Sequence, residues 1–195
     1  MKATFALLLD HNVHNMVRKL AVEVHQAYQI GLVGSQLPPH VSLKQPFLIS
    51  DLSTLEAYFD QLAKSIDPLI LSFPRIAGPG NAPILWLEVE ETETLRQLHT
   101  RINQELAERF SETQAPFDGS AYHFHLTIAL GGASSSVYQS MVAELESRNV
   151  AFQAIARHLV LFYYDDDQYS PGSFLTYKIL PLGKTPVGLD DTRNG

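Results

Sequence analysis

Two short elements of the sequence combine residue types that could carry out acid–base chemistry on a phosphate. One pairs His40 with Ser42, and the other pairs His125 with Thr127, each across a single apolar residue. Residues two apart on a β-strand share a face, so each pair would point the same way while its apolar neighbours enter a core. An imidazole can move a proton while a hydroxyl donates a hydrogen bond to a phosphate oxygen.

Two such elements facing each other would suit attack on phosphorus, which needs a base on the incoming water and an acid on the departing oxygen. We expect His125 to deprotonate the water and His40 to protonate a departing ribose oxygen. The reverse assignment stays equally open, because the two elements are interchangeable. A single His-x-Ser/Thr sequence is weak, since short motifs arise by chance. These two gain weight because each opens an expected strand and is followed by a helix at a similar distance; two unrelated strand histidines are the alternative.

The motif surroundings resemble the 2H phosphoesterase superfamily, which includes 2′-5′ RNA ligase-like proteins and cyclic nucleotide phosphodiesterases. Pro39–Lys44 and Phe124–Ile128 look like its two signature motifs, and the resemblance extends over most of residues 3–182. Ser42 stands where threonine is commoner in the family, and Phe124 where proline often precedes the histidine. The resemblance implies a bilobal, pseudo-twofold α+β fold with the motif residues lining a central cleft.

Carried over by position, the resemblance makes His40 and His125 the catalytic pair and Ser42 and Thr127 the phosphate ligands. It also implies a reaction that needs neither metal nor ATP, so we expect no cofactor. Hydrolysis of a 2′,3′-cyclic phosphate or a related small nucleotide phosphodiester is the activity we expect. A 2′-5′ RNA ligase or RNA-end processing enzyme is one alternative, and a non-catalytic module that binds nucleotides or RNA ends is another.

Lys44 is a candidate for neutralising the phosphate, because a continuing strand would place it on the face of His40. A solvated lysine at a strand end is an equally good interpretation. Arg75 is a weaker candidate for the same work.

Stacking of a nucleobase would need an aromatic side chain at the cleft, and Phe47, Trp86 and Tyr164 are the candidates. Burial in the core is the commoner fate of strand aromatics. Tyr122 is set aside, because the alternation places it on the face opposite His125.

A metal site is the alternative to metal-free catalysis. His123 and His125 would share a strand face, but the acidic cluster Asp165–Asp167 falls in a predicted hairpin loop, where solvated turn residues are the simpler account. We therefore predict no metal. His99, like His11, His14 and His25, lies in a helical pattern rich in polar residues and is predicted to be at the surface.

These side chains would be positioned by a chain that alternates between strand and helix patterns. The closely spaced strands favour mainly antiparallel sheets with flanking helices, and the segments from His40 and from His125 repeat the same order. Together with the resemblance, this predicts an α+β fold of two such sheets with a central cleft. Strands are expected at 3–9, 40–49, 69–73, 84–89, 122–130, 155–164 and 174–180, and helices at 13–24, 55–66, 95–110 and 137–145.

Composition limits the partners. The chain has 195 residues, 45% of them hydrophobic, no cysteine and a formal net charge of −7, which suits one folded bilobal domain at 1–185 with a flexible tail at 186–195. Wrapping of duplex DNA is not expected, because it needs many cations; a small nucleotide or RNA end is the expected partner. The apolar run Phe5–Leu9 is too short for a signal sequence or a membrane span, so we expect a cytoplasmic monomer with no membrane partner.

Overall fold

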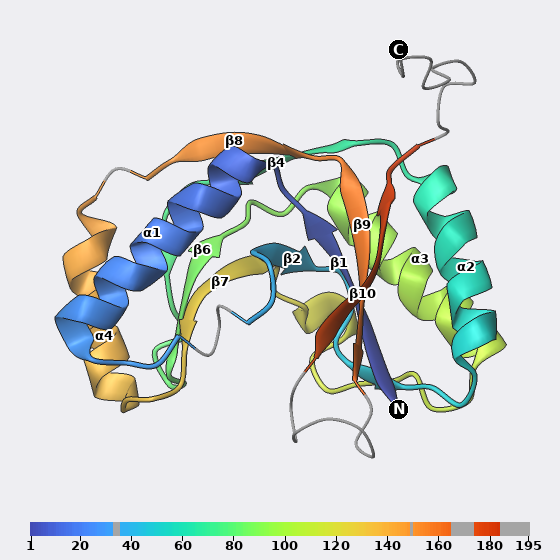
Figure 1. The fold of residues 1–195 in the computed structure, drawn as a ribbon, viewed down its shortest axis with the longest axis horizontal. Helices are drawn as coiled ribbons and strands as arrows, with labels where there is room; N and C mark the ends of the chain where they lie inside the picture. The colour runs from blue at the N-terminus through green and yellow to red at the C-terminus, as the bar shows by residue number, and fades with distance from the viewer. Residues whose placement is uncertain (33–35, 149, 165–173, 184–195) are drawn as a thin grey trace, which may run out of the picture.

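A computed structural model describes residues 1–32, 36–148, 150–164 and 174–183 of the chain, as an α+β fold (Figure 1). The helices are α1 (His11–Tyr28), α2 (Leu52–Ser65), α3 (Glu93–Arg109) and α4 (Ser135–Glu146), with a 3-10 turn, η2 (Gly119–Ala121). The strands are β1 (Lys2–Leu8), β2 (His40–Ser42), β3 (Phe47–Leu48), β4 (Leu69–Phe73), β5 (Ile76–Ala77), β6 (Ile84–Glu88), β7 (His125–Leu130), β8 (Phe152–Ala156), β9 (His158–Tyr164) and β10 (Leu175–Pro181).

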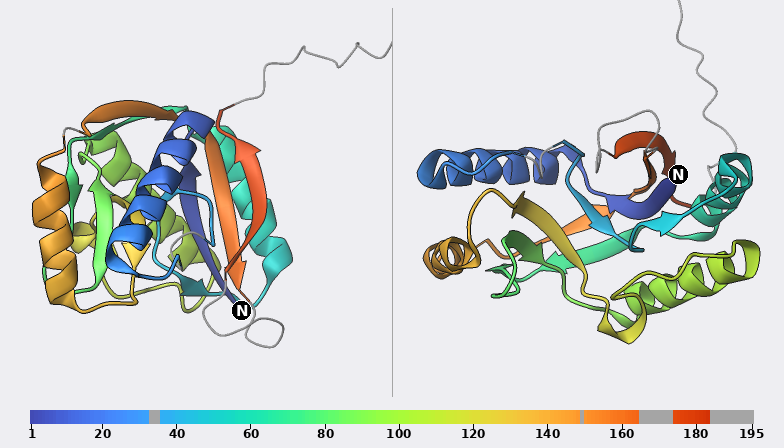
Figure 2. Two further views of the ribbon diagram at one scale, coloured as in Figure 1. Left: turned by 60° about the vertical axis from the view of Figure 1, so that its left-hand side comes forward. Right: turned by 90° about the horizontal axis from the view of Figure 1, so that it is seen from below.

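The large sheet runs in the order β10-β9-β1-β2-β7-β6-β5, with β3 also paired to β1, and β4 and β8 form a separate ribbon. Every strand pair in the described residues is antiparallel. Helices α1 and α4 lie together at one end of the molecule and α2 and α3 at the other, with the strands between them (Figures 1 and 2). The expected α+β class with two antiparallel sheets is therefore confirmed.

Local sequence explains where three of the helices begin. The carboxylate of Asp10 accepts hydrogen bonds from the first backbone amides of α1, Asp51 does the same for α2, and the hydroxyl of Thr92 does so for α3. These side chains satisfy amides that have no partner inside the helix. Helix α1 ends at Gln29, whose φ of 56° is left-handed.

The two faces of the sheet differ in what covers them. On β1, Phe5 and Leu7 enter the main core, which the helices and the β4–β8 ribbon complete. Ala6 lies on the opposite face, in a smaller cluster with Val160 and Phe162. We call this second face the site face, because the side chains of interest lie on it.

Several expected strands are shorter or divided. The strand expected at 40–49 is two strands, β2 and β3, which pair with different parts of β1. The strand expected at 122–130 begins only at His125, because the preceding residues close the η2 turn. The strand expected at 155–164 is β8 and β9, since β8 leaves the large sheet to pair with β4. The predicted tail at 186–195 and the predicted loop at 165–172 lie outside the described residues.

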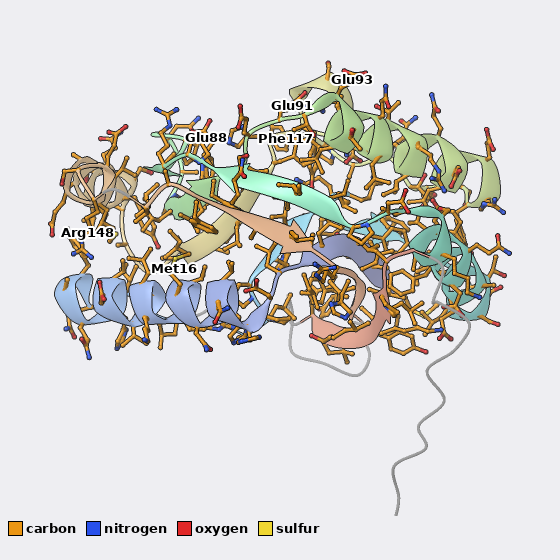
Figure 3. The ribbon with its side chains drawn as sticks, turned by 90° about the horizontal axis from the view of Figure 1, so that it is seen from above. Met16, Glu88, Glu91, Glu93, Phe117 and Arg148 are labelled. Atoms are coloured by element: carbon orange, nitrogen blue, oxygen red, sulfur yellow. The ribbon has the colours of Figure 1, made fainter. Side chains whose placement is uncertain are left out.

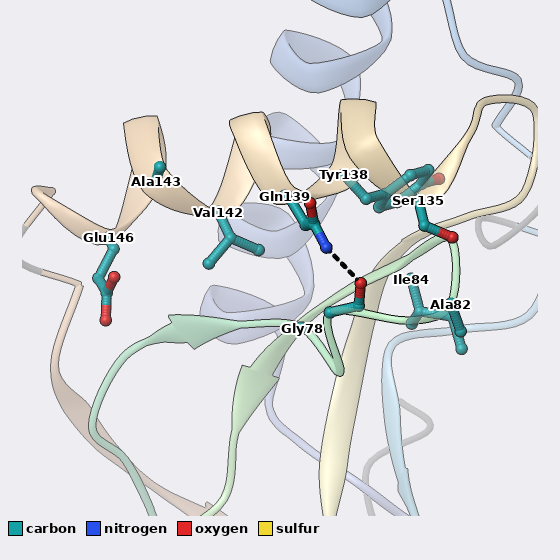
Figure 4. Close-up of a pocket in the computed structure, with 10 residues that line it drawn as sticks. Gly78, Ala82, Ile84, Ser135, Tyr138, Gln139, Val142, Ala143 and Glu146 are labelled. Carbon is teal, nitrogen blue, oxygen red and sulfur yellow. Dashed lines mark hydrogen bonds between the residues drawn. The ribbon is translucent and has the colours of Figure 1, made fainter.

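Helix α4 holds the β5–β6 hairpin in place. The Gln139 side chain donates a hydrogen bond of 2.6 Å to the carbonyl of Gly80, and Val142 and Ile84 face each other across a small pocket of about 170 Å³ (Figure 4). A Cβ on Gly78 would lie 2.8 Å from the carbonyl oxygen of Ile84, so this position requires glycine. The contact fixes β6, which borders the site.

No helix in the described part of the chain is long and apolar enough to cross a membrane.

Candidate active site

The central strands β2 and β7 carry the motif residues side by side. Val41 pairs with Leu126 in the antiparallel register, and both are fully buried in the main core. The residues on either side of this pair must therefore turn to the site face. These are the four motif residues, all half-buried: His40, Ser42, His125 and Thr127.

The same register sets the distances within the site. One step from the buried pair, His40 lies opposite Thr127 and Ser42 lies opposite His125. The two histidines are thus diagonal neighbours, and such positions are separated by roughly 7–8 Å. That separation lets two imidazoles flank one phosphate with a hydroxyl beside each of them.

Both imidazoles are held in the same way. Nδ1 of His40 lies 2.8 Å from the carbonyl oxygen of Pro38, and Nδ1 of His125 lies 2.9 Å from that of His123. A carbonyl oxygen only accepts hydrogen bonds, so each Nδ1 must carry a hydrogen. In the neutral state Nε2 is then the free basic atom, and in the charged state it is the proton donor.

An aromatic ring from an outer strand packs against each histidine. The ring of Phe162 on β9 meets His40 edge-on at 4.7 Å between centroids, and Trp86 on β6 lies at the same distance from His125. Trp86 is only 8% exposed. Its ring also lies 5.1 Å from that of His123, so its observed contacts are with these two histidines, and nucleobase stacking on Trp86 stays a prediction.

The surroundings favour neutral histidines. Burial lowers the pKa of His40 to about 4, and the nearby charges of His125 and Arg18 act in the same direction, against the opposing Pro38 carbonyl. Burial, followed by the charge of His123, also lowers the pKa of His125. In the free protein at neutral pH both rings are ready to accept a proton rather than donate one.

The β6 edge of the site carries paired charges. Glu88 pairs in register with His125, and Arg75 Nε lies 2.5 Å from the Glu88 carboxylate. Arg75, Glu88 and His123 line a pocket of about 370 Å³ together with Trp86. Figure 3 labels Glu88 along with Glu91 and Glu93, which follow it in the chain.

Lys44 does not lie on the strand face of His40, where the sequence predicted it. Strand β2 ends at Ser42, so the alternation that predicted a shared face with His40 does not reach it. The Lys44 side chain is fully buried and forms an ion pair with Asp118, while its carbonyl accepts a 2.6 Å hydrogen bond from Thr4. The expected shared face with His40 is therefore wrong, and so is the alternative of a solvated lysine, because the ammonium is buried and already paired with Asp118.

Phe47, predicted as a candidate for stacking on a nucleobase, also lies elsewhere. It pairs with Ala3, a core-facing residue, and packs against Phe5 at 5.7 Å in the main core. It is thus on the face opposite the motif residues and cannot stack on a base in the cleft. Tyr164 shares the face of Phe162 but is only 3% exposed, with the ring of Phe174 at 5.5 Å.

Two residues close to Ser42 in the structure, Tyr122 and His99, were not among the site residues predicted from the sequence. Tyr122 is buried, and its ring stacks on His99 at 4.1 Å between centroids; burial raises its pKa, and the neighbouring Ser42 acts in the opposite direction. Tyr122 packs in the main core, so setting it aside as a stacking candidate is confirmed, although the strand behind that prediction begins only at His125. His99, expected at the surface, is fully buried: its Nδ1 lies 2.8 Å from the Leu43 carbonyl and its Nε2 accepts from the Gly119 amide at 3.0 Å.

The described residues contain no group of three or more His, Asp or Glu side chains that could hold a metal ion. The predicted alternative, His123 and His125 with Asp165–Asp167, depends on a segment outside the described residues.

Comparison with known proteins gives concordant results. Residues 14–168 match the model of the 2′-5′ RNA ligase superfamily. Proteins named "Putative phosphoesterase" from Bacillus licheniformis and Staphylococcus aureus are 26% and 28% identical over 153 residues, covering 75% and 74% of this chain and 82% and 83% of theirs.

Solved structures share the fold. The structure of Escherichia coli LigT complexed with 3′-AMP gives a TM-score of 0.56 at 16% identity, covering 94% of this chain and 98% of that one. TT0787 of Thermus thermophilus gives 0.54 at 15% identity, covering 95% and 100%. Since the family model spans most of the chain, including both motifs, this protein belongs to the 2′-5′ RNA ligase superfamily.

Proposed function

We propose that this protein is a phosphodiesterase that opens the 2′,3′-cyclic phosphate of a small nucleotide without a metal ion. The observation that carries the proposal is the arrangement of His40 and His125. They occupy diagonal positions on adjacent strands, and each has its Nδ1 bound to a carbonyl so that Nε2 is available for proton transfer. Proton removal from water and proton donation to the ribose oxygen then need only these two rings.

We assign His40 as the base and His125 as the acid, which reverses the assignment made from sequence. A base must be neutral before the reaction, and burial together with the charges of His125 and Arg18 keeps the pKa of His40 low. A negatively charged phosphodiester favours protonation of a nearby histidine. His125 has no arginine among the causes of its own shift, so the substrate would charge it more readily.

Ser42 and Thr127 would stabilise the negative charge that gathers on the non-bridging phosphate oxygens. Each hydroxyl lies directly across the strand pair from the other element's histidine. Donors that are held in place before the reaction are effective because they need no reorganisation as charge develops.

The bound ligands of a structural relative support the substrate class. LigT has been crystallised with 3′-AMP and with phosphate. A nucleoside 3′-phosphate is one of the two products that opening of a 2′,3′-cyclic phosphate gives.

Charge favours this small substrate over a long RNA. The chain carries a net charge of −7. Next to the site, Arg75 and Arg96 are already paired with Glu88 and Glu91. An RNA ligase would need cations for a long phosphate backbone, and a non-catalytic module would bind without turnover.

The test is a substrate screen with product identification. A 2′,3′-cyclic nucleotide, a 3′,5′-cyclic nucleotide, a linear dinucleotide and short RNAs with defined ends would be compared, and products separated by chromatography. We expect turnover of the 2′,3′-cyclic substrate, a loss of roughly 10²–10⁴-fold in His40→Ala or His125→Ala, and smaller losses in Ser42→Ala. His158→Ala, an exposed histidine on β9, is the matched control. Binding of the cyclic nucleotide without any turnover would contradict the proposal.

A further inference from the structure

Arg18 on α1 reaches the segment that leads into β2. Its side chain is half-buried, and its guanidinium donates a hydrogen bond to the carbonyl of Leu37. Among the residues that the structure describes, Arg75, Arg96, Arg101 and Arg148 each have a carboxylate within ion-pair distance, whereas Arg18, Arg109 and Arg157 have none. Arg109 and Arg157 are exposed, so Arg18 is the half-buried member of this group.

The Leu37 carbonyl is one residue before the carbonyl that holds His40. Leu37 itself packs beside the site-face cluster, and the next carbonyl, that of Pro38, accepts the hydrogen from His40 Nδ1. Arg18 therefore anchors the short segment on which the orientation and the hydrogen position of the His40 ring depend.

Arg18 also supplies positive charge to this part of the site. The titratable or charged groups that act on His40 are His125 from β7 and Arg18 from α1, while β9 contributes the uncharged Phe162 ring. His158 lies level with His40 on the other side of β1, since both pair with Leu8, and its side chain is exposed. A partly buried guanidinium without a carboxylate partner has lost hydration without gaining a counter-ion, so an anion bound near it would be stabilised.

We propose, on the basis of the phosphodiesterase function above, that Arg18 is a positioning residue for His40 and provides the charge for phosphate binding that was expected of Lys44. The two parts of this role are separable. The hydrogen bond to Leu37 orders the segment next to His40, and the positive charge opposes protonation of His40 until an anionic phosphate arrives.

Two substitutions separate charge from anchoring. Arg18→Met removes both, whereas Arg18→Lys keeps the charge but replaces the planar guanidinium, which is suited to directed hydrogen bonds. Lys19→Met is the matched control, because Lys19 is the exposed next residue of the same helix and its loss changes the net charge equally. Circular dichroism would show that each variant keeps the fold.

The first measurement is an NMR titration of the His40 ring in the free protein, with the signal assigned by its loss in His40→Gln. We expect Arg18→Met to raise the pKa of His40 by roughly 0.5–1 unit, from one charge at a distance of several ångströms in a solvated protein. Arg18→Lys and Lys19→Met should leave it close to the wild-type value. An unchanged His40 pKa in Arg18→Met would overturn the charge part of the proposal.

The second measurement is binding of inorganic phosphate, followed by kinetics on the 2′,3′-cyclic nucleotide. Arg18→Met should weaken phosphate binding by roughly three- to tenfold, and Lys19→Met should not. Arg18→Lys should lower kcat with little change in KM; a wild-type kcat in that variant would overturn the anchoring part. The titration and the phosphate binding need no turnover, so they can fail or succeed independently of the proposed phosphodiesterase activity.

Discussion

The pH dependence of hydrolysis tests the two-histidine mechanism most directly. The reactive form of the free protein has one histidine neutral and the other charged. Two ordinary histidines, which titrate near 6.5, would place both sides of the rate profile near neutrality. In the structure the pKa of His40 is about 4 and that of His125 is also lowered, so kcat/KM should be highest at acidic pH, between about 4 and 6.5.

Bound substrate should raise the two pKa values that define the sides of the pH–rate profile. A phosphodiester carries one negative charge, and a charge pair about 4 Å apart contributes about 1–4 kcal/mol, depending on the surroundings. Because about 1.4 kcal/mol corresponds to one pKa unit, the limbs of kcat, which report the substrate complex, should lie roughly one unit or more above those of kcat/KM. Initial rates from pH 3.5 to 9 at constant ionic strength give both profiles.

Variants identify which histidine is the base. In His125→Ala the residual rate should rise through about pH 4 and then stay level, because only the neutral form of His40 is needed. If His40 were the acid, the residual rate would fall above that pH instead. If kcat/KM of the wild-type protein were highest at neutral or alkaline pH, the two-histidine assignment would be refuted. Circular dichroism across the acidic range must show that the fold is intact.

Four further predictions concern catalysis and stability. The double variant His40→Ala/His125→Ala should be little worse than either single variant, because the two rings act as a unit, and kinetic measurement of all three would show additive losses if they act separately. Activity should survive chelators, and loss on chelation with recovery on adding one particular metal would contradict the metal-free mechanism. Lys44→Met should lower the free energy of unfolding in urea by about 3 kcal/mol, because it leaves the mostly buried carboxylate of Asp118 without its partner; an unchanged urea midpoint would show that the pair adds nothing. Burial lowers the pKa of His99, so the unfolded chain binds more protons below about pH 6.5 and the free energy of unfolding should fall from pH 7.5 to 5, less so in His99→Gln.

The sequence by itself determined the class of fold and which four residues make up the candidate site. A histidine and a hydroxyl two residues apart needed only a strand to share a face, and the interleaved Val41 and Leu126 are apolar enough to settle which face is buried. This inference depends on the alternation of side chains between the two faces of a strand, and it is confirmed within β2 and β7. Helix positions were equally local, since caps such as Asp10 and Thr92 and a helical apolar period lie within a few residues of each other.

Tertiary structure decided everything that depended on where a strand ends or on what lies across it. The same alternation failed for Lys44, because the chain leaves the sheet after Ser42. The alternation of residues along a strand cannot reveal that the carboxylate of Asp118 will pair with Lys44. Nor can it reveal that Arg18, on a helix that precedes the first motif, comes to lie beside His40. Such contacts join residues that have no fixed spacing in the chain, so only the pairing of distant strands and helices brings them together.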